Sequence, residues 1–425
     1  MTQVRSFPNW VRNLYDREKW RWCADWLVVA IAAALPWSTS MSVVLIGLWG
    51  IAFLGMRDFA LTFKEWTRPA GGLPVALWML AIVGMLWATV PWDERIDGLS
   101  TYHRLFAIPV LFVQFRQSHR AQYVLIAFVA SCTLMLMVSW ALALLPDLPW
   151  RGHKPDFPGI PVKDYIAQAQ AFTLCVFGLS VAAARAWNFA RYRLAFGLGT
   201  LALLFLSNIL YIAPSRTALI TIPILLLLLA FARLGWKGLA GATVLATTLA
   251  LLAWHTSPAL QRRVTLLEQE IRDYDPSGPA TSVGERLQFW SKSIAFIADA
   301  PVLGHGTGSI RDQFRRAAYG ETGIAAEVAA HPHNQIFAVA IQLGLFGTVV
   351  LIAMWVAHLL LFRGPEWPAV IGLAVVVQNV IGSMFNSLLF DFTPGWIYVF
   401  GVGVLGSMTM RRPVLRSSSA SSGPT

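Results

Sequence analysis

Long runs of apolar residues dominate this chain and restrict the folds open to it. Of its 425 residues, 56% are hydrophobic and only 13% are charged, whereas a soluble globular domain has about 25% charged residues. The apolar runs approach the ~20 residues that cross a bilayer as a helix. We therefore predict an all-α, polytopic membrane protein.

About twelve membrane-spanning helices are expected from these runs. Their approximate bounds are 24–39, 41–56, 73–90, 104–115, 121–145, 166–184, 194–213, 217–232, 238–254, 335–361, 368–387 and 393–410. The span at 104–115 is short, so it tilts little, thins the bilayer locally or is broken. No internal repeat indicates an inverted-repeat transporter.

Positive charge is distributed unequally between the two sides that these spans define. With the long polar segment 255–334 left out, the side of the N-terminus has 19 Lys and Arg residues and the opposite side has 6. Because Lys and Arg concentrate in cytoplasmic loops, we predict that both termini are cytoplasmic and that 255–334 faces the periplasm. The net charge of +11 then indicates cytoplasmic loops and contacts with anionic membrane lipids, not nucleic acid.

The two ends of the chain differ in composition from the spans. Phe7, Trp10 and Leu14 have helical spacing beside arginines, which predicts an interfacial helix on the cytoplasmic surface. Residues 1–22 are too long and polar for the start of a cleaved signal peptide. Residues 411–425 are rich in serine and are expected to be a disordered cytoplasmic tail. The three cysteines do not have the spacing of a disulfide framework or a zinc site.

The segment 255–334 is predicted to form a small helical lid. An apolar stripe from Leu260 to Tyr274 indicates a first helix, which Pro276 ends. Ser282 begins a capping box, Ser-Val-Gly-Glu, and so starts a second helix. A glycine-rich turn precedes Ser309, which caps a third short helix. The predicted organisation is a membrane region at 1–254, a periplasmic catalytic loop at 255–334, a second membrane region at 335–410 and a tail at 411–425.

Two arginines are candidates for binding an anionic group. Arg216 lies at a break between two apolar spans, where an unpaired charge is costly and is therefore a functional candidate. The alternative is an arginine that extends from a helix end to the membrane surface. Arg286 lies on the second lid helix, and a guanidinium binds phosphate through two hydrogen bonds at any physiological pH. The alternative is an exposed residue paired with Glu285.

His333 is the candidate general base. It lies in His331-Pro-His-Asn334, directly before an apolar helix that begins near Gln335. The dipole at a helix N-terminus favours the neutral imidazole, and a base near pH 7 must be neutral. The alternative is that both histidines are interfacial or capping groups.

Other polar residues are weaker candidates. Asp273-Tyr-Asp275 has the spacing of a metal-binding DxD motif, but it ends a helix just before a proline, so no metal site is assigned. Several polar residues lie in or near spans, where they line a sugar-binding cavity or join helices. They are Gln168, Gln170, Gln378, Asn379, Asn386 and Asp391.

Four motifs follow one another in the second half of the chain. They are Ser215-Arg-Thr-Ala218, Arg286-Leu-Gln-Phe-Trp290, Pro301-Val-Leu-Gly-His-Gly-Thr-Gly308 and His333-Asn-Gln-Ile-Phe337. In this order, and with one long late external loop, they resemble the O-antigen ligase/O-antigen polymerase superfamily. The first half of the chain resembles it only in its pattern of spans. Phe337 departs from the family's aliphatic residue, and no role is carried over to His331.

The resemblance implies a GT-C-like glycosyltransferase of the bacterial inner membrane with a periplasmic active site. Its donor would be O-antigen on undecaprenyl diphosphate, and its acceptor a sugar of the lipid A–core oligosaccharide. Arg216 and Arg286 would bind the diphosphate, and His333 would be the general base. The reaction would be inverting and independent of metals and cofactors. Further substrate-binding candidates are Asn334, Trp290 and Asp391. The sequence predicts no particular oligomeric state.

Three alternatives to a ligase are considered. An O-antigen polymerase would use a second lipid-linked glycan as acceptor, but polymerases often have a second large external loop, and here the next largest is about 146–165. Relatives that glycosylate proteins usually have a further C-terminal portion. A small-anion transporter would place its main charges at broken helices near the membrane midplane, where this chain has no such cluster.

Overall fold

A computed structural model describes residues 16–145, 147–150, 159–275, 278 and 281–411, and within these ranges the chain is all-helical. Its helices are α2 (Arg17–Ala34), α3 (Thr39–Met56), α4 (Phe59–Trp66), α5 (Pro69–Gly84), α6 (Trp92–Ser100), η1 (His103–Phe106), α7 (Ala107–Arg116), α8 (Ala121–Leu144), α9 (Tyr165–Asn188), α10 (Tyr192–Tyr211), α11 (Arg216–Thr256), α12 (Pro258–Arg272), α13 (Ser282–Asp299), α14 (Ile310–Ala317), η2 (Gly323–Ala326), α15 (Gln335–Leu361), α16 (Trp367–Ser383) and α17 (Phe392–Thr409). The predicted interfacial helix near the N-terminus and the predicted tail lie outside the described residues.

The all-helical membrane class is confirmed, whereas the count of twelve spans is not. Six described stretches are long and apolar enough to cross a bilayer: Thr39–Met56, Ala121–Leu144, Tyr165–Asn188, Tyr192–Tyr211, Leu234–Thr256 and Gln335–Leu361. The remaining predicted spans coincide with shorter or more polar helices. The predicted span at 104–115 is one of these, since it begins as the 3-10 helix η1 and continues as the ten-residue α7. Every residue of α7 except the last, Arg116, is buried in the protein, so its length is not set by the bilayer.

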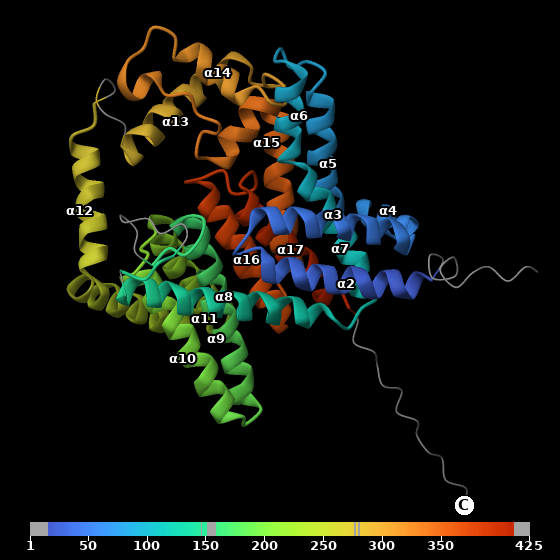
Figure 1. Ribbon diagram of the computed structural model, residues 1–425, viewed down its shortest axis with the longest axis vertical. Coiled ribbons are helices and arrows are strands. Elements are labelled where there is room, and N and C mark those ends of the chain that lie inside the picture. Colours follow the sequence, from blue (N-terminus) through green and yellow to red (C-terminus); the bar gives the residue numbers. More distant parts are fainter. Residues whose placement is uncertain (1–15, 146, 151–158, 276–277, 279–280, 412–425) are drawn as a thin grey trace, which may run out of the picture.

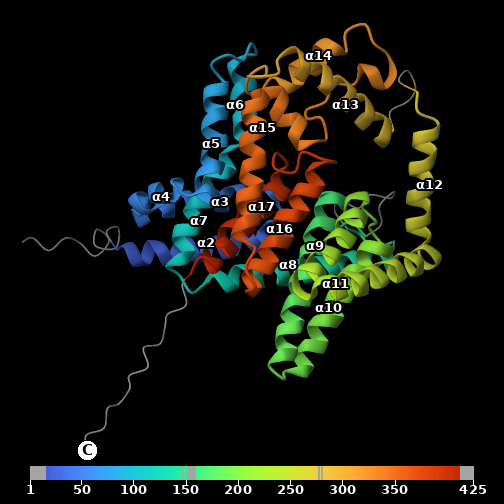
Figure 2. The same cartoon turned by 180° about the vertical axis from the view of Figure 1, so that it is seen from behind.

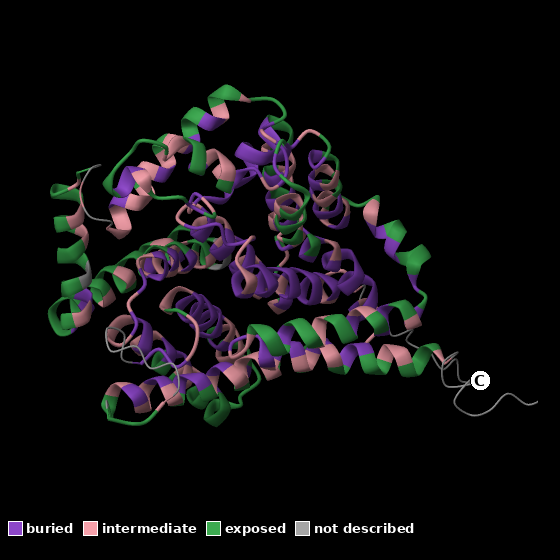
Figure 3. Cartoon of the chain, turned by 45° about the horizontal axis from the view of Figure 1, so that its top comes forward, coloured by how far each residue is buried: buried purple, intermediate pink, exposed green. Residues whose placement is uncertain are grey.

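Helices α16 and α17 form the centre of the fold. Figure 3 shows α17 almost entirely buried, and its buried residues run from Thr393 to Ser407. Glycines let its neighbour α7 approach closely. A Cβ on Gly403 would lie 2.6 Å from Leu111, and one on Gly406 would lie 2.6 Å from Phe112. Small residues are the usual means of close helix packing in membranes.

The outer layer presents apolar side chains outward. Helices α2, α3 and α8 run side by side in both ribbon views (Figures 1 and 2). Val44, Ile51, Ile126 and Met137 on these helices are more than half exposed. Such a large apolar surface suits contact with lipid rather than water.

The three predicted lid helices are confirmed as α12, α13 and α14, with a correction at two caps. Thr281, not Ser282, caps α13 by accepting from the backbone N–H of Gly284 at 3.1 Å. The Ser282 hydroxyl instead accepts from Arg286 at 2.8 Å. Ser309 precedes α14 as predicted, but its side chain makes no capping hydrogen bond. Figures 1 and 2 show α13 and α14 above the first part of α15.

The glycine-rich turn at 301–308 repairs a break in α15. Gly344 has a positive φ of 58° and non-helical geometry, which interrupts the helical hydrogen bonds. The turn supplies partners on both sides of the break. His305 N–H donates to Ile341 O at 2.8 Å, Gly306 N–H donates to Gln342 O at 2.9 Å, and Leu345 N–H donates to Pro301 O at 2.9 Å. The lid is thereby joined to the helix that follows His333.

The same turn also caps the end of α5. Thr307 N–H donates to Gly84 O at 3.1 Å, and its hydroxyl donates to Ala81 O at 2.6 Å. Gly306 reaches this place only because it has no side chain, since a Cβ there would lie 2.5 Å from the Cα of Ala88. Its φ of 88° is a second requirement for glycine.

We expect Gly306→Ala to destabilise the protein. The left-handed backbone alone costs an L-residue about 1–2 kcal/mol, and the backbone clash with Ala88 adds to this cost. The thermal unfolding midpoint of the purified protein in detergent should fall. The loss of a monodisperse sample on heating measures this midpoint. Gly241→Ala in α11 is the matched control, because a Cβ there meets nothing within 4 Å. Equal midpoints for the two variants would contradict the assigned role of the turn.

Candidate functional site

The turn between α16 and α17, residues 384–391, gathers polar side chains from three other segments. His333 Nδ1 lies 2.9 Å from Asn386 Oδ1. Arg286 Nε donates to Phe385 O at 3.4 Å. Gln335 Oε1, at the start of α15, accepts from Leu389 N–H at 2.9 Å. These contacts join positions 50 or more residues apart in sequence, and they define the candidate site.

The backbone around His333 fixes the direction of its imidazole. His333 has a φ of 52°, which is uncommon for a non-glycine residue and frequent at functional positions. Asn334 follows as the cap of α15, with Oδ1 accepting from Ile336 N–H at 2.9 Å and Phe337 N–H at 3.2 Å. The Phe289 ring lies parallel to the imidazole, with 8° between the planes and 6.0 Å between the centroids. His333 therefore lies just before the N-terminus of α15, as predicted.

Asn386 determines which nitrogen of His333 carries the proton. Its Nδ2 donates to the Asp391 carboxylate at 3.2 Å. An ionised carboxylate only accepts, so the amide oxygen is the atom that faces His333. Nδ1 of His333 must then be the donor, and Nε2 keeps its lone pair. The chain His333–Asn386–Asp391 thus selects the tautomer whose outer nitrogen can take up a proton.

The surroundings of the two histidines keep them neutral. Burial lowers the pKa of His333, the hydrogen bond to Asn386 partly raises it, and the positive charge of Arg286 lowers it. Burial, with a smaller effect of His333, lowers the pKa of His331 to about 4. His331 Nε2 lies 3.8 Å from Asp391, and its ring is 4.5 Å from that of His333. Near pH 7 both imidazoles are uncharged.

The pKa of Asp391 is shifted in the opposite direction, upward. Its pKa is raised to about 7, first by burial and then by the Asp164 carboxylate, while Arg104 acts to lower it. Arg104 also donates to the backbone carbonyls of this turn, among them Phe390 O at 3.1 Å. Protonation of Asp391 near neutral pH would turn one of its oxygens into a donor, so that the carboxyl no longer fixes which end of the Asn386 amide faces it.

The two predicted arginines lie on different elements, and Arg286 is the one that contacts this turn. Arg286 on α13 bonds Ser282 as well as Phe385, and its charge acts on His333. Arg216 is the first residue of α11, and its guanidinium pairs with Glu270 of α12 at 3.2 Å. Its neighbour Thr217 lies beside Gly382 at the end of α16. The structure therefore places both arginines near the end of α16, with Arg216 held by a lid carboxylate.

The other candidate substrate-binding residues differ in what they contact. Trp290 packs edge-on against Phe337 at 6.2 Å, and its indole N–H has no acceptor among the described residues. Asn334 uses its amide to cap α15 and to donate to Met384 O at 3.2 Å, which is a structural role. Asp391 acts on Asn386 as described above.

Two of the polar residues predicted near the spans join helices through their side chains. Gln168 donates to Asn208 at 3.3 Å, and Gln378 donates to Gln170 O at 3.0 Å. Asn386 is different, because it contacts His333. Its sequence neighbourhood carries no signal for this role. In the part of the chain that the structure describes, no group of three or more His, Cys, Asp or Glu side chains is placed to hold a metal ion.

Comparison with known proteins gives a match to one family over part of the chain. Residues 201–352 match the model of the family described as O-Antigen ligase. The match includes Arg216, Arg286 and His333 and leaves the turn at 384–391 outside. No curated protein sequence matches the chain.

We expect two substitutions to shift the pKa of His333 in opposite directions. Asn386→Ala removes a hydrogen bond that raises this pKa, so the value should fall. Arg286→Gln removes a positive charge that lowers it, so the value should rise. Titration of the histidine side chains by nitrogen-15 NMR, assigned with His333→Gln, measures both shifts. A shift in the same direction for both variants would rule out the geometry described here.

Proposed function

Because residues 201–352 carry the O-antigen ligase family domain, we propose that the chain is an O-antigen ligase. It would transfer polysaccharide from undecaprenyl diphosphate to a sugar of the lipid A–core oligosaccharide, on the periplasmic side of the bacterial inner membrane. The observation that supports the proposal is the hydrogen bond between His333 Nδ1 and Asn386, which leaves Nε2 free to accept a proton, together with the effect of the Arg286 charge on the imidazole.

His333 acts as general base in this proposal. Its Nε2 takes the proton from an acceptor hydroxyl while that oxygen attacks the anomeric carbon of the donor sugar. The bond from this carbon to the diphosphate oxygen breaks, and the lipid diphosphate leaves with the electron pair. A single displacement from the opposite face inverts the anomeric configuration. The reaction needs no redox partner and no further proton donor at this step.

The arginines stabilise the leaving group. Negative charge increases on the diphosphate oxygen as the glycosidic bond breaks, and fixed positive groups lower the energy of that state. A guanidinium binds two phosphate oxygens at once and stays charged at any relevant pH. Arg286 and Arg216 supply this charge from α13 and α11, so the chemistry is proposed to be independent of metal.

Neighbouring residues orient the substrates and the base. Asn386 and Asp391 hold the tautomer of His333, and Asn334 fixes the start of α15. The unpaired indole N–H of Trp290 would donate to a sugar hydroxyl. The lid helices would exclude water, which otherwise hydrolyses the donor.

The placement of the chain ends fits the proposed orientation. Arg411, after α17, donates to the carbonyls of Phe115 and Ser118 at the end of α7. Arg21, near the start of α2, pairs with Asp58 at 2.9 Å. Figure 1 shows both ends of the described chain away from α13 and α14. We propose that both ends are cytoplasmic and that 255–334 is the periplasmic catalytic loop.

We expect His333→Ala to abolish transfer in a reconstituted reaction. Purified protein is given lipid-diphosphate-linked glycan and lipid A–core, with and without EDTA. Loss of a general base reduces the rate by about 10²–10⁴-fold. EDTA should have no effect. His255→Ala, at an exposed position at the end of α11, is the control and should remain active.

The product of this reaction distinguishes the candidate activities. Glycan joined to lipid A–core supports the ligase. Longer lipid-linked glycan with lipid A–core unchanged would show an O-antigen polymerase. No product with substrates of the native strain would refute both and favour an anion transporter.

We expect the transfer rate to fall as the pH drops below about 7, because Asp391 then becomes protonated. Protonation of this carboxyl, whose pKa is raised to about 7, lets the Asn386 amide turn, and Nε2 of His333 is then no longer basic. In Asp391→Asn a neutral amide that can also donate takes the place of the protonated carboxyl, so the rate should be low on both sides of pH 7 and should show no decline there.

A second variant checks the cause. Asp164→Asn removes a charge that raises the pKa of Asp391 but keeps the capping oxygen of α9. Asp164→Asn should lower the pKa of Asp391 and so move the decline in the transfer rate to lower pH. Identical rate profiles for the native protein and Asp391→Asn would refute the role of the carboxyl.

A further inference from the structure

A second pocket lies at the end of the bundle away from His333. It has a volume of about 690 Å³ and lies between the start of α2, the end of α7 and the start of α8. This volume is in the range of small-molecule sites. The catalytic proposal uses none of its residues.

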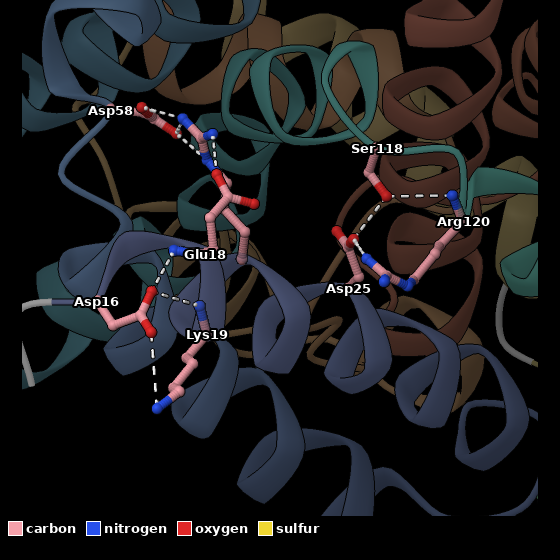
Figure 4. A network of polar contacts seen from close by, with 8 residues as sticks. Asp16, Glu18, Lys19, Asp25, Asp58, Ser118 and Arg120 are labelled. Atoms are coloured by element: carbon pink, nitrogen blue, oxygen red, sulfur yellow. Dashed lines mark hydrogen bonds and ion pairs between the residues drawn. The ribbon is translucent and has the colours of Figure 1, made fainter. Parts of the chain in front are cut away.

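The inner wall of the pocket is a fully buried carboxylate with a complete set of partners. Asp25 on α2 is 1% exposed. It accepts from Gln114 Nε2 at 3.0 Å. It also accepts from Ser118 Oγ at 2.5 Å and from Arg120 Nη1 at 3.2 Å (Figure 4). Because one side chain on α2 bonds the ends of α7 and α8, the wall is rigid without a ligand.

The rim of the pocket carries charges of both signs. The side chain of Glu18 is 81% exposed and gives one oxygen to Arg21 at 3.0 Å. Lys19 is 59% exposed, and Arg120, which bonds Asp25 through Nη1, is 38% exposed. A ligand in this pocket therefore meets the Glu18 carboxylate and the cations Lys19, Arg21 and Arg120.

Aromatic rings connect the pocket to the lipid-facing surface. Trp22 and Tyr123 line it, and both are more than 40% exposed. Trp26 lies between them, 6.2 Å from the Trp22 ring and stacked on the Tyr123 ring at 5.8 Å. Trp and Tyr concentrate where a membrane meets water. One turn further along α8, Ile126 is 59% exposed, as expected of a side chain in lipid.

We propose that this pocket binds the headgroup of a phospholipid that carries a primary ammonium group, such as phosphatidylethanolamine. The phosphate lies at Arg120 and Lys19, and the ammonium donates hydrogen bonds to Glu18. The acyl chains follow the aromatic cluster onto the outer faces of α2 and α8. A headgroup with phosphate alone offers Glu18 no donor beyond Arg21, and a trimethylated ammonium has no N–H to donate.

Native mass spectrometry of the full-length protein in detergent tests the proposal. The protein is offered phosphatidylethanolamine, phosphatidylcholine and phosphatidylglycerol in equal amounts. Phosphatidylethanolamine should be retained in preference to the other two. Equal retention of all three, or preference for phosphatidylglycerol, would overturn the proposal. Phosphoethanolamine without acyl chains should not compete at equal concentration, and competition would show a soluble ligand instead of a lipid.

Variants locate the site. Glu18→Gln should remove the preference for phosphatidylethanolamine over phosphatidylcholine, and Lys19→Ala should weaken retention of all three lipids. Exposed charge pairs predict a loss of about two- to fivefold in each case. Glu268→Gln is the matched control, because Glu268 is 66% exposed and is ion-paired on the distant helix α12. An unchanged preference in Glu18→Gln would exclude this pocket. The readout does not depend on transfer activity.

Discussion

Backbone hydrogen bonding inside a membrane is the constraint on which this structure depends. Lipid offers no partner to an exposed N–H or carbonyl group, so a broken helix is tolerated only where protein supplies the missing partners. Helix α15 is broken at Gly344, and the turn at 301–308 supplies them. That turn connects α13 to α14. The requirement to satisfy a membrane helix therefore fixes the lid above the same helix whose N-terminus follows His333.

The candidate site combines groups whose electrostatic effects depend on one another. Arg286 lowers the pKa of His333, which keeps the imidazole neutral, and the same arginine is placed to bind an anion. Asp391 is buried enough to titrate near neutral pH, and it acts on His333 only through Asn386. An anion beside Arg286 would offset its charge and make His333 a stronger base. Binding of an anionic donor would therefore favour proton removal from the acceptor.

Much of the fold and part of the site follow from local sequence patterns. Apolar runs and stripes predicted the helices, including α12, α13 and α14 in the lid, because periodicity reports which face of a helix is buried. The number of spans was not predictable, since α7 is short for a helix that crosses a bilayer and is covered by protein instead. The motifs indicated Arg216, Arg286 and His333. Local sequence patterns did not indicate the roles of Asn386 and Glu270, because these roles arise from contacts between residues 53 and 54 positions apart.

The Arg216–Glu270 ion pair has a consequence for the order of events. Glu270 accepts from Arg216 and also from Val283 N–H at 3.1 Å, so one carboxylate ties α11 to the start of α13. A diphosphate that takes Arg216 must displace this carboxylate. The exchange keeps the arginine neutralised throughout, which avoids the cost of an unpaired charge at the membrane surface. It also removes one tie between the lid and the membrane helices. In the proposed reaction, binding of the donor would thereby loosen the lid. Without the donor, the lid would stay in place and exclude both acceptor and water.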